Sequence, residues 1–546
     1  MGAFVSRILA GVAVSLVWAA AGAATVPRTS TPGAQQNRTR ETQQYYQQRK
    51  KNERPRVPEN PIVRPGPPPQ GKGAGHKGPA FVLKDVRFNK SHFLKPRVLA
   101  GVVKPYLDHK VTVADLRTIV ARINKLYTRR DIYTAKAVLP PQRVRHGVVH
   151  IELVEGRLGK LQIQGNHYTK GGFIRARVSQ QPGQVVDGAV LKDDLVFFNR
   201  TSDMQLRAVL RPGAEKGLTR ILLMAQEPPR VQVGVFVDDA GSTSTGRYRA
   251  GATFRLHGPL RIDDRLDGYF VGSRGARDGF VSYSVPVNDR NGRLGVSYSR
   301  DSINIIKGPS QALDITGHAS TETVQFVQPF IASQHWLVSW ASSVSHTSSR
   351  TEAQGTPIAT ARTDNLSTGA TVQRNTRRYQ WALTQTASAV HSRETLDSRH
   401  NFFIYHGRGS FLRTIGAGPY SVLMKGRVQY SPADQLPDTE LFQIGGVGSV
   451  RGYEPGVVAG SSGLSAQVEL HKAFKPKLDG FLFLDAGAVY QAFPKDESIS
   501  AVGAGTSFQL GRRVTGNVDL GVPLKTVTPQ QDNYRIDFRL TAHWNF

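Results

Sequence analysis

The sequence predicts a mixed fold, in which two small α/β modules precede an antiparallel β-barrel that spans a membrane. Three observations lead to this fold class. The order strand, helix, strand, strand occurs twice between residues 80 and 228, the apolar period changes to two from residue 231 onwards, and the chain begins with an export signal. A chain of 546 residues also has room for roughly two to four domains of ordinary size.

The first 23 residues have the layout of a secretory signal peptide. Arg7 supplies a positive charge, an apolar run follows from Ile8 to Ala21, and Ala21-Gly22-Ala23 is a small-residue cleavage site. The apolar run is shorter than the roughly 20 residues that a helix needs to cross a bilayer, so export is favoured over a membrane anchor. Cysteine is absent, and we expect neither disulfides nor thiol chemistry.

The chain is strongly basic, with a formal net charge of +30. Its Lys and Arg residues are spread along the sequence instead of forming one basic domain, and export separates the protein from nucleic acid. We therefore expect a polar barrel lumen and contact with anionic surfaces, and no nucleic-acid partner.

Residues 24–79 contain ten prolines, carry a net charge of +8 and hold almost no aliphatic side chains, so they cannot form a core of their own. Within them, Gln35 to Arg54 is rich in helix formers but has no apolar stripe, and such a helix needs a polar environment. We predict a tail with a helix in residues 24–54 and an extended linker in residues 55–79. Gly73 to Gly78 matches a dinucleotide-binding glycine pattern but follows no strand, so no cofactor is expected.

Two small α/β modules are predicted for residues 80–228. The first contains a strand at Phe81–Phe88, an amphipathic helix at Val113–Thr128, and strands at Ile132–Leu139 and Val148–Val154; the second contains a strand at Leu158–Gln164, helices at Phe173–Val178 and Leu191–Asn199, and a hairpin of Met204–Arg211 with Leu218–Gln226. No cluster of catalytic residue types accompanies them. A short sheet edge, however, can accept an incoming strand from a partner.

From Val231 on, apolar and polar side chains alternate, most regularly in the last strand. There Ile536, Phe538, Leu540, Ala542 and Trp544 alternate with Arg535, Asp537, Arg539, Thr541 and His543. Strands of about ten residues with one apolar face are typical of transmembrane barrels. A soluble β-sandwich alternates too, but the export signal and the aromatic carboxyl end, Trp544 and Phe546, favour a barrel in the outer membrane.

A glycine-rich turn, Gly445 to Gly456, interrupts this β region and has Arg451 at its centre. Further on, Asp485 is the only charged residue in the apolar run Gly480 to Tyr490. An isolated carboxylate in such a run needs a partner, and a guanidinium fits a carboxylate with two parallel hydrogen bonds. Our hypothesis is that Arg451 pairs with Asp485 and holds the turn inside the lumen. The alternative is that Asp485 faces water and Arg451 binds a phosphate or a lipid head group.

Several of these motifs resemble the two-partner secretion transporters, the TpsB family of haemolysin and haemagglutinin secretion proteins. The family's first POTRA domain is resembled by Leu126-Tyr127, Leu139-Pro140-Pro141-Gln142 and Glu152 to Gly156, and the end of its second by Ala208 to Gly213 with Glu227-Pro228-Pro229. The family's loop signature is resembled by Val450-Arg451-Gly452-Tyr453. Its second signature, on an inward-facing strand, is resembled by Phe483 to Gly487, which includes Asp485 and Gly487. The helix and linker ahead of them resemble the family's plug helix and tether.

The resemblance implies six parts. These are a signal peptide (1–23), a tail with the plug helix (24–54), a linker (55–79), two POTRA domains (80–156 and 157–228) and a barrel of sixteen strands (229–546). It further implies a role for an acid at Glu469. Asp238-Asp239 resembles the family's first-hairpin pattern, with an acid where Asn is usual. Adjacent acids can bind a metal, but on a turn they are more often solvated, and no metal is expected.

The function implied is a pore in the Gram-negative outer membrane, with its POTRA domains in the periplasm, that exports a large β-helical exoprotein. Outer-membrane lipids and the barrel-assembly machinery are the other implied partners. Enzyme motifs are missing, including the Gly-x-Ser-x-Gly elbow, His-Glu-x-x-His and the phosphate loop, so no catalytic residues are expected. The alternatives are a factor that assembles or inserts other barrels, a passive porin and a surface adhesin.

Overall fold

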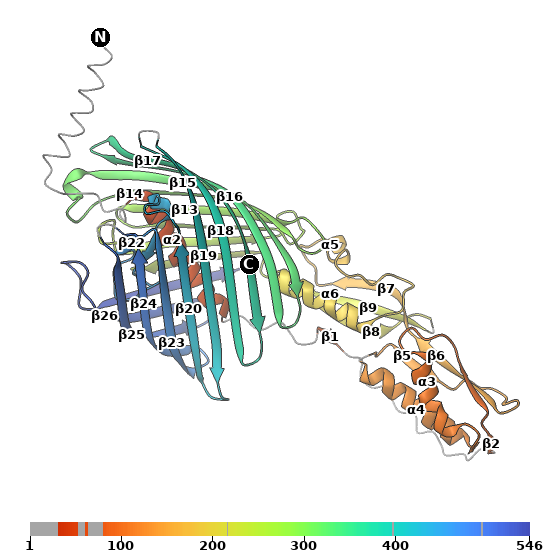
Figure 1. Ribbon diagram of the computed structural model, residues 1–546. Coiled ribbons are helices and arrows are strands. Elements are labelled where there is room, and N and C mark those ends of the chain that lie inside the picture. The colour runs from red at the N-terminus through yellow and green to blue at the C-terminus, as the bar shows by residue number, and fades with distance from the viewer. Residues whose placement is uncertain are drawn as a thin grey trace, which may run out of the picture.

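The computed structural model describes residues 31–52, 61–63, 80–130, 132–215, 217–395, 398–492 and 495–546. A β-barrel makes up its larger part, and two small α/β modules extend in line from one end of the barrel (Figure 1). The predicted signal peptide, residues 1–23, and the glycine pattern Gly73 to Gly78 lie outside the described residues.

The first module contains two helices, a three-stranded sheet and a separate two-stranded sheet. Its elements are β2 (Phe81–Val82), β3 (Asp85–Phe88), α3 (Pro96–Val103), β4 (Lys110–Val111), α4 (Val113–Arg129), β5 (Ala135–Val138) and β6 (Val148–Glu155). Helix α4 begins with a capping box, in which the Thr112 hydroxyl accepts from the Asp115 amide and the Asp115 carboxylate accepts from the Thr112 amide. The prediction of one strand over Phe81–Phe88 was wrong, because β2 pairs with β4 whereas β3 pairs with β6. Helix α3, which has proline at its start, was not predicted.

The second module consists of β7 (Arg157–Gln164), α5 (Gly171–Arg175), α6 (Gly188–Thr201), β8 (Gln205–Pro212) and β9 (Leu218–Gln226). Helix α5 ends three residues before the predicted Val178. The chain turns back there, and the Arg175 guanidinium donates to the carbonyls of Val178 at 3.0 Å and Gln180 at 2.9 Å. An additional strand, β1 (Ile62–Val63), comes from the predicted linker and pairs in parallel with β8, so the sheet order is β1-β8-β9-β7.

The barrel consists of sixteen antiparallel strands in a closed ring, which confirms the predicted fold class. They are β10 (Val231–Asp238), β11 (Arg249–His257), β12 (Arg265–Gly272), β13 (Ala276–Pro286), β14 (Arg293–Asn304), β15 (Ile315–Ala332), β16 (Trp336–Ala353), β17 (Thr356–Asn375), β18 (Tyr379–Glu394), β19 (Arg399–Ile415), β20 (Tyr420–Tyr430), β23 (Ser462–Lys475), β24 (Leu478–Tyr490), β25 (Glu497–Leu510), β26 (Val514–Pro523) and β27 (Arg535–Asn545). The ring closes where β10 pairs with β27, and the amide of the terminal Phe546 donates to the carbonyl of Val231 at 2.8 Å.

The two faces of the barrel strands differ in the predicted way. In β27, Arg535, Asp537 and Arg539 are at most 5 % exposed and face inward, whereas Ile536 and Leu540 are exposed on the outer surface. Period-two alternation therefore places charge in the lumen and apolar side chains toward lipid.

Helix α2 (Pro32–Asn52) lies inside the barrel (Figure 1). It begins three residues before the predicted Gln35. Its buried side chains are mostly polar, among them Gln35, Gln36, Arg38, Thr39, Thr42 and Gln43, and they face the polar lumen. In the described part of the chain, no helix has both the length and the apolar character needed to span a bilayer.

The connection between β20 and β23 is a long loop that folds back into the barrel. It contains η5 (Asp438–Glu440), β21 (Phe442–Ile444) and β22 (Val458–Gly460), and the glycine-rich turn lies between β21 and β22. A small apolar cluster of Phe442, Ile444, Val450, Tyr453, Val489, Ile499 and Ala501 fixes the loop against β24 and β25. We call residues 431–461 the inward loop.

Candidate functional site

Arg451, at the tip of the inward loop, is completely buried and meets the Asp485 carboxylate on β24. Its Nε donates to Asp485 Oδ2 at 2.7 Å, its Nη2 donates to Oδ1 at 2.8 Å, and its own amide donates to Oδ2 at 3.1 Å. Because Asp485 is buried as well, three donors satisfy a carboxylate that would otherwise be costly in this position.

A second carboxylate and an aromatic ring complete the surroundings of Arg451. Nη1 lies 2.8 Å from Oε1 of Glu469 on β23, and the guanidinium carbon lies 3.6 Å from the ring centroid of Phe483. The other Glu469 oxygen lies 2.8 Å from Nε2 of His471. From the sequence, Glu469 was only a possible site residue, implied by the family resemblance. Its place facing Arg451 follows from β23 lying next to β24, which strand alternation alone does not reveal.

Two glycines allow the loop tip to approach the barrel wall. Gly452 has a φ of +86°, and a Cβ built on Gly521 in β26 would lie 2.6 Å from the Gly452 nitrogen. Real Cβ atoms do not come this close to backbone atoms, so the contact requires glycine at residue 521. Gly487 is also tightly placed, since a Cβ there would lie 3.1 Å from the Leu464 carbonyl oxygen. Gly521 was not predicted as a site residue from the sequence.

The remaining residues of the loop motif are buried in the wall. Val450 is completely buried, and the Tyr453 hydroxyl lies 3.0 Å from the Ser500 carbonyl and 2.9 Å from the Lys525 carbonyl. The tip of the inward loop is thus held by β23, β24, β25 and β26.

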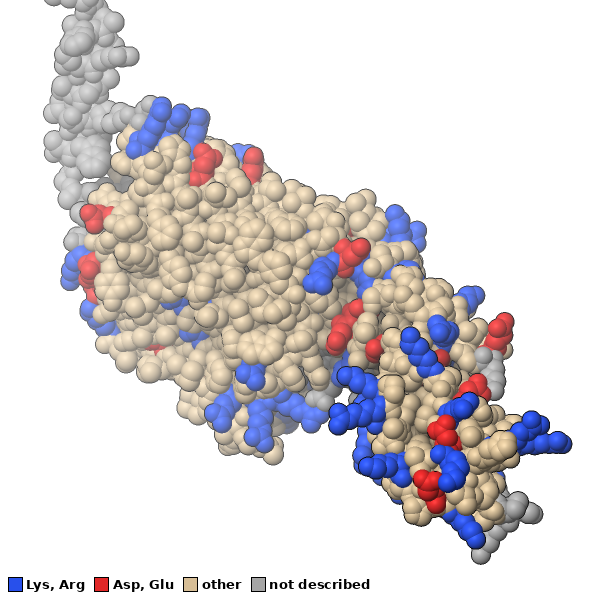
Figure 2. Space-filling view, turned by 45° about the vertical axis from the view of Figure 1, so that its right-hand side comes forward, with Lys and Arg blue, Asp and Glu red and all other residues tan. Residues whose placement is uncertain are grey.

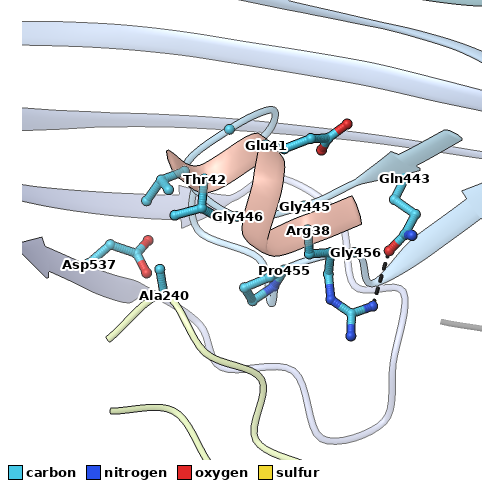
Figure 3. Close-up of a pocket in the computed structure, with 12 residues that line it drawn as sticks. Arg38, Glu41, Thr42, Ala240, Gln443, Gly445, Gly446, Pro455, Gly456 and Asp537 are labelled. Atoms are coloured by element: carbon cyan, nitrogen blue, oxygen red, sulfur yellow. Dashed lines mark hydrogen bonds between the residues drawn. The ribbon is translucent and has the colours of Figure 1, made fainter. Parts of the chain in front are cut away.

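Helix α2 packs on the inner side of this loop (Figure 3). Arg38 donates to the Gln443 amide oxygen at 3.0 Å, and the Gln443 amide nitrogen donates to the Ala34 carbonyl at 3.2 Å. Asn37 donates to the Thr439 carbonyl. Arg38 points from the helix toward the loop segment that carries Gly456, whereas the Glu41 carboxylate points away from Gly445, Gly446 and Pro455 (Figure 3).

The helix also contacts the barrel wall through polar groups. The side-chain amide of Gln36 donates to Ser299 at 3.2 Å and accepts from Thr321 at 2.9 Å. On the opposite side, Arg539 donates to the Gln43 oxygen at 3.2 Å. Together, α2 and the inward loop occupy the lumen of the barrel.

The adjacent acids at the start of the barrel bind arginines. Asp238 accepts from Arg249 at 2.8 Å, and Asp239 accepts from the Arg247 guanidinium at 3.0 Å. No group of three or more potential metal ligands occurs among the described residues. The aromatic residues at the carboxyl end lie at the seam of the barrel, where Trp544 is the register partner of Val233 and Phe546 is 72 % exposed.

The second module is fastened to the barrel turns by charged and polar groups that the sequence analysis did not identify. Asp203 forms an ion pair with Arg265 at 2.8 Å, and Arg177 donates to the Asn291 side chain at 2.5 Å and to the Asn288 carbonyl at 2.8 Å. Burial by itself would raise the pKa of Asp203, but the adjacent Arg265 outweighs burial and lowers this pKa to about 2. Asp203 is therefore ionised at neutral pH.

Comparison with known proteins gives matches over nearly the whole described chain. The heme/hemopexin transporter protein HuxB of Haemophilus influenzae (strain 86-028NP) is 24% identical over 471 residues, which is 80% of this chain and 82% of the relative. The outer membrane transporter CdiB of Dickeya dadantii (strain 3937) is 25% identical over 230 residues, 41% of this chain and 40% of the relative.

Among solved structures, CdiB from Escherichia coli has a TM-score of 0.68 at 18% identity and covers 95% of this chain and 100% of its own. BamA from Haemophilus ducreyi lacking POTRA domains 1–3 has a TM-score of 0.53 at 13% identity and covers 85% of this chain and 100% of its own. At these identities the two structures establish a shared fold.

Two family models match the chain, one in the first module and one over most of the barrel. A model of the ShlB-type POTRA domain matches residues 81–156. A second model, described as haemolysin secretion/activation protein ShlB/FhaC/HecB, matches residues 217–510 and so covers more than half of the sequence. The chain belongs to the haemolysin secretion/activation protein family ShlB/FhaC/HecB.

Proposed function

We propose that this chain exports one large partner polypeptide through its barrel, and that α2 is the removable plug of the pore. Members of the family are outer-membrane transporters of two-partner secretion, with their POTRA domains in the periplasm. They work with large secreted exoproteins and are not enzymes. The observation that carries the proposal is the occupied lumen, in which a polar helix from the amino-terminal tail fills a closed barrel of sixteen strands.

The contacts of α2 and those of the inward loop differ in kind, and this difference suggests which of the two leaves the lumen. The contacts of α2 are mainly hydrogen bonds between polar side chains, each worth about 0.5–1.5 kcal/mol net because water replaces them when the helix leaves. Arg451, in contrast, is buried between two carboxylates, and separating it from them would leave uncompensated buried charge. We infer that α2 leaves during export while the tip of the inward loop stays in place.

In this proposal the division of the chain follows the sequence analysis. The modules of residues 80–156 and 157–228 take up an extended, β-prone segment of the partner by strand addition and pocket contacts. The edge of β8 already carries a short strand, β1, so an incoming strand at that edge would have to displace it. Folding of the exported β-helical chain outside the cell would give transport its direction.

Two further partners belong to the same proposal. Outer-membrane lipids contact the apolar outer face of the barrel, on which Leu482, Leu484 and Phe270 are more than half exposed. The barrel-assembly machinery inserts the barrel into the membrane.

Deletion of residues 80–228 tests the proposal against a passive porin. A porin would conduct ions with or without the two modules. We expect the chain that lacks residues 80–228 to insert into the membrane and conduct ions but no longer to export its partner. Normal export of the partner by the chain that lacks residues 80–228 would refute the proposal. The partner is sought as the large β-helical exoprotein encoded by a neighbouring reading frame.

A factor that assembles other barrels is the second candidate, supported by the fold shared with BamA. Such factors usually carry more than two POTRA domains, so the present architecture favours secretion. Assembly of unrelated outer-membrane barrels, measured in cells lacking this chain, separates the two functions, and we expect it to be unchanged.

A further inference from the structure

Three cations lie together on the lumen wall beside α2. Arg408 belongs to β19, and Lys425 and Arg427 belong to the neighbouring β20. Arg408 and Arg427 are direct register partners, and Lys425 is the partner of Ser410. All three border a cavity of about 260 Å³ between the wall and the helix.

Each of these cations is met by a different side chain of α2. Glu41 forms an ion pair with Arg427, the Gln44 side-chain oxygen accepts a hydrogen bond from Arg408, and the Tyr45 ring centroid lies 4.3 Å from the Lys425 ammonium. Glu41 is the only acidic residue in the helix. A single carboxylate of the helix is therefore placed among three cations of the wall.

Groups that do not belong to the helix also hold Arg427 in position. Its Nη2 donates to the Gln443 carbonyl at 2.8 Å, its Nε donates to Ser465 at 3.2 Å, and its guanidinium carbon lies 4.9 Å from the Phe442 ring centroid. Since the inward loop and β23 supply these contacts, the orientation of Arg427 does not depend on α2. The cationic group is preorganised for an anion that replaces Glu41.

Departure of the helix would leave Arg408 and Arg427 opposite each other without the Glu41 carboxylate. Like charges directly opposite on neighbouring strands repel each other, so an incoming anion is favoured there. Another part of the lumen wall offers no comparable charge, since Ser343 pairs with Ser367 at 2.8 Å and Thr371 with Thr384 at 3.0 Å. The cationic group is thus flanked, across β16 to β18, by a hydroxyl-lined part of the lumen wall.

We propose that Arg408, Lys425 and Arg427 form a carboxylate-binding site in the lumen, which Glu41 fills at rest and acidic side chains of the moving polypeptide fill during export. This inference rests on the proposed function. In a hydrated lumen each such ion pair is weak, because water screens the two charges. Weak binding suits a passage, because a transported chain must be able to leave every site that it enters.

The charge of the periplasmic modules supports an acidic ligand. Residues 80–228 contain 26 Lys and Arg against 12 Asp and Glu. On the face shown in Figure 2, Lys and Arg outnumber Asp and Glu over these modules. Exposed cations of α4 include Arg117, Arg122, Lys125 and Arg129. A polypeptide that carries carboxylates would be attracted first to the modules and then to the site in the lumen.

Single-channel recording of the full chain in planar bilayers tests the site. Polyglutamate added on the periplasmic side is expected to block open events, and polylysine of the same length is not. The triple variant R408Q/K425Q/R427Q should need on the order of tenfold more polyglutamate for the same block. The matched control R274Q/K307Q/K495Q removes equal charge at exposed barrel turns, outside both the lumen and the periplasmic modules, and should retain the block. Equal block of the triple variant and the unmodified chain would overturn the site.

A second variant leaves the barrel wall unchanged. Glu41→Gln removes the resident carboxylate, so polyglutamate should block at several-fold lower concentration; an unaltered blocking concentration counts against the proposal. Inorganic phosphate at matched negative charge is the third probe, and block as strong as that by polyglutamate would show a small-anion site and refute a polypeptide site. If the partner is exported normally while polyglutamate blocks all variants alike, the carboxylate site fails and the proposed function stands.

Discussion

Arg451 is the residue that anchors the tip of the inward loop to the barrel wall. It has no exposed surface, it satisfies Asp485 and Glu469 at once, and it stacks on Phe483. Removal of a partner from a buried ion pair costs more than the pair contributes, because the remaining charge is left without compensation. Here two carboxylates would be left together.

Arg451→Ala is therefore expected to release the tip of the inward loop. The upper limit of the loss is the roughly 3–5 kcal/mol measured for buried pairs, and entry of water into the lumen reduces it. Hydrogen exchange of the amides in residues 445–456 measures the release. Arg290→Ala, in an exposed barrel turn, is the control. Unchanged protection of the loop in the Arg451 variant would contradict this role.

Glu469, the second carboxylate beside Arg451, changes how a charge-reversal experiment on Arg451 and Asp485 should be interpreted. In the double variant R451D/D485R, the carboxylate introduced at residue 451 would face Glu469 and be repelled, so the exchanged pair cannot restore the original geometry. Failure of this swap would say little about direct pairing. Adding Glu469→Gln to the swap removes the repulsion, and partial recovery of loop protection is expected in that triple variant.

Gly521 provides a purely steric prediction. A Cβ at this residue would lie 2.6 Å from the Gly452 nitrogen, so Gly521→Ala forces the loop tip and β26 apart at a cost of about 1–3 kcal/mol. Faster proteolysis within residues 445–456 is the expected result. In Gly409→Ala the new Cβ would meet only Leu383 Cδ1 at 3.9 Å, an ordinary contact, and proteolysis should not change. Equal rates in both variants would exclude the steric role.

The sequence predicted part of this site for a clear physical reason. A lone carboxylate in an apolar run and an arginine in a glycine-rich turn both require a partner, and each offers the chemistry that the other lacks. Glu469 and Gly521 gave no such signal. Their contacts depend on which strands are neighbours and on how far the loop enters the barrel, and neither follows from local alternation.

At the scale of elements, the position of α2 follows from its composition. A helix without an apolar stripe gains nothing from packing on a hydrophobic core, but it can exchange hydrogen bonds with a polar lumen. The sequence therefore predicted the kind of environment. It did not predict where in the barrel the helix binds, because that depends on side chains of the wall and the inward loop.

The close approach of α2 to the inward loop at Gly33 allows the helix to be locked. A Cβ built on Gly33 lies 3.4 Å from the Thr439 Cβ, close to the roughly 3.5–4.5 Å of disulfides, and the chain has no other cysteine. The double variant G33C/T439C should form a disulfide that keeps the helix in the lumen. We expect export to stop under oxidising conditions and to recover after reduction.

Each single cysteine variant is the control for this lock and should export the partner under both conditions. Export by the oxidised double variant, with the disulfide demonstrated on non-reducing gels, would show that the partner passes while α2 remains in place. That result would contradict the plug role.

At the scale of the whole molecule, the sequence predicted strands, their inward and outward faces and the change of architecture near residue 230. Closure of the ring was less accessible, because β10 and β27 are about three hundred residues apart and their pairing is set by the number and stagger of all the strands between them. The pairing of β1 with β8 was also beyond local patterns, since two residues in a proline-rich segment carry no periodicity.

Docking of the second module on the barrel gives the last prediction, which concerns pH. Asp203 has a pKa lowered to about 2 beside Arg265, against about 4 for an unperturbed aspartate. A carboxyl group whose pKa is lowered in the docked state stabilises docking at pH values above its ordinary pKa. This stabilisation is lost as pH falls from about 4 toward 2. Docking should therefore be constant from neutral pH down to about 5 and weaken below 4.

Asp203→Asn removes this contribution, and we expect docking at neutral pH to weaken by about 1–2 kcal/mol, a value that allows for partial solvent exposure of the pair. Distances between spin labels on cysteines introduced at Lys160 and Gly418, both exposed, report the position of the module relative to the barrel. The Asn variant should show a broad distance distribution already at pH 7, whereas Asp193→Asn on the exposed side of α6 should keep the narrow one. A narrow distribution for the Asp203 variant would mean that the hydrogen bonds of Arg177 to Asn288 and Asn291 hold the module without this ion pair.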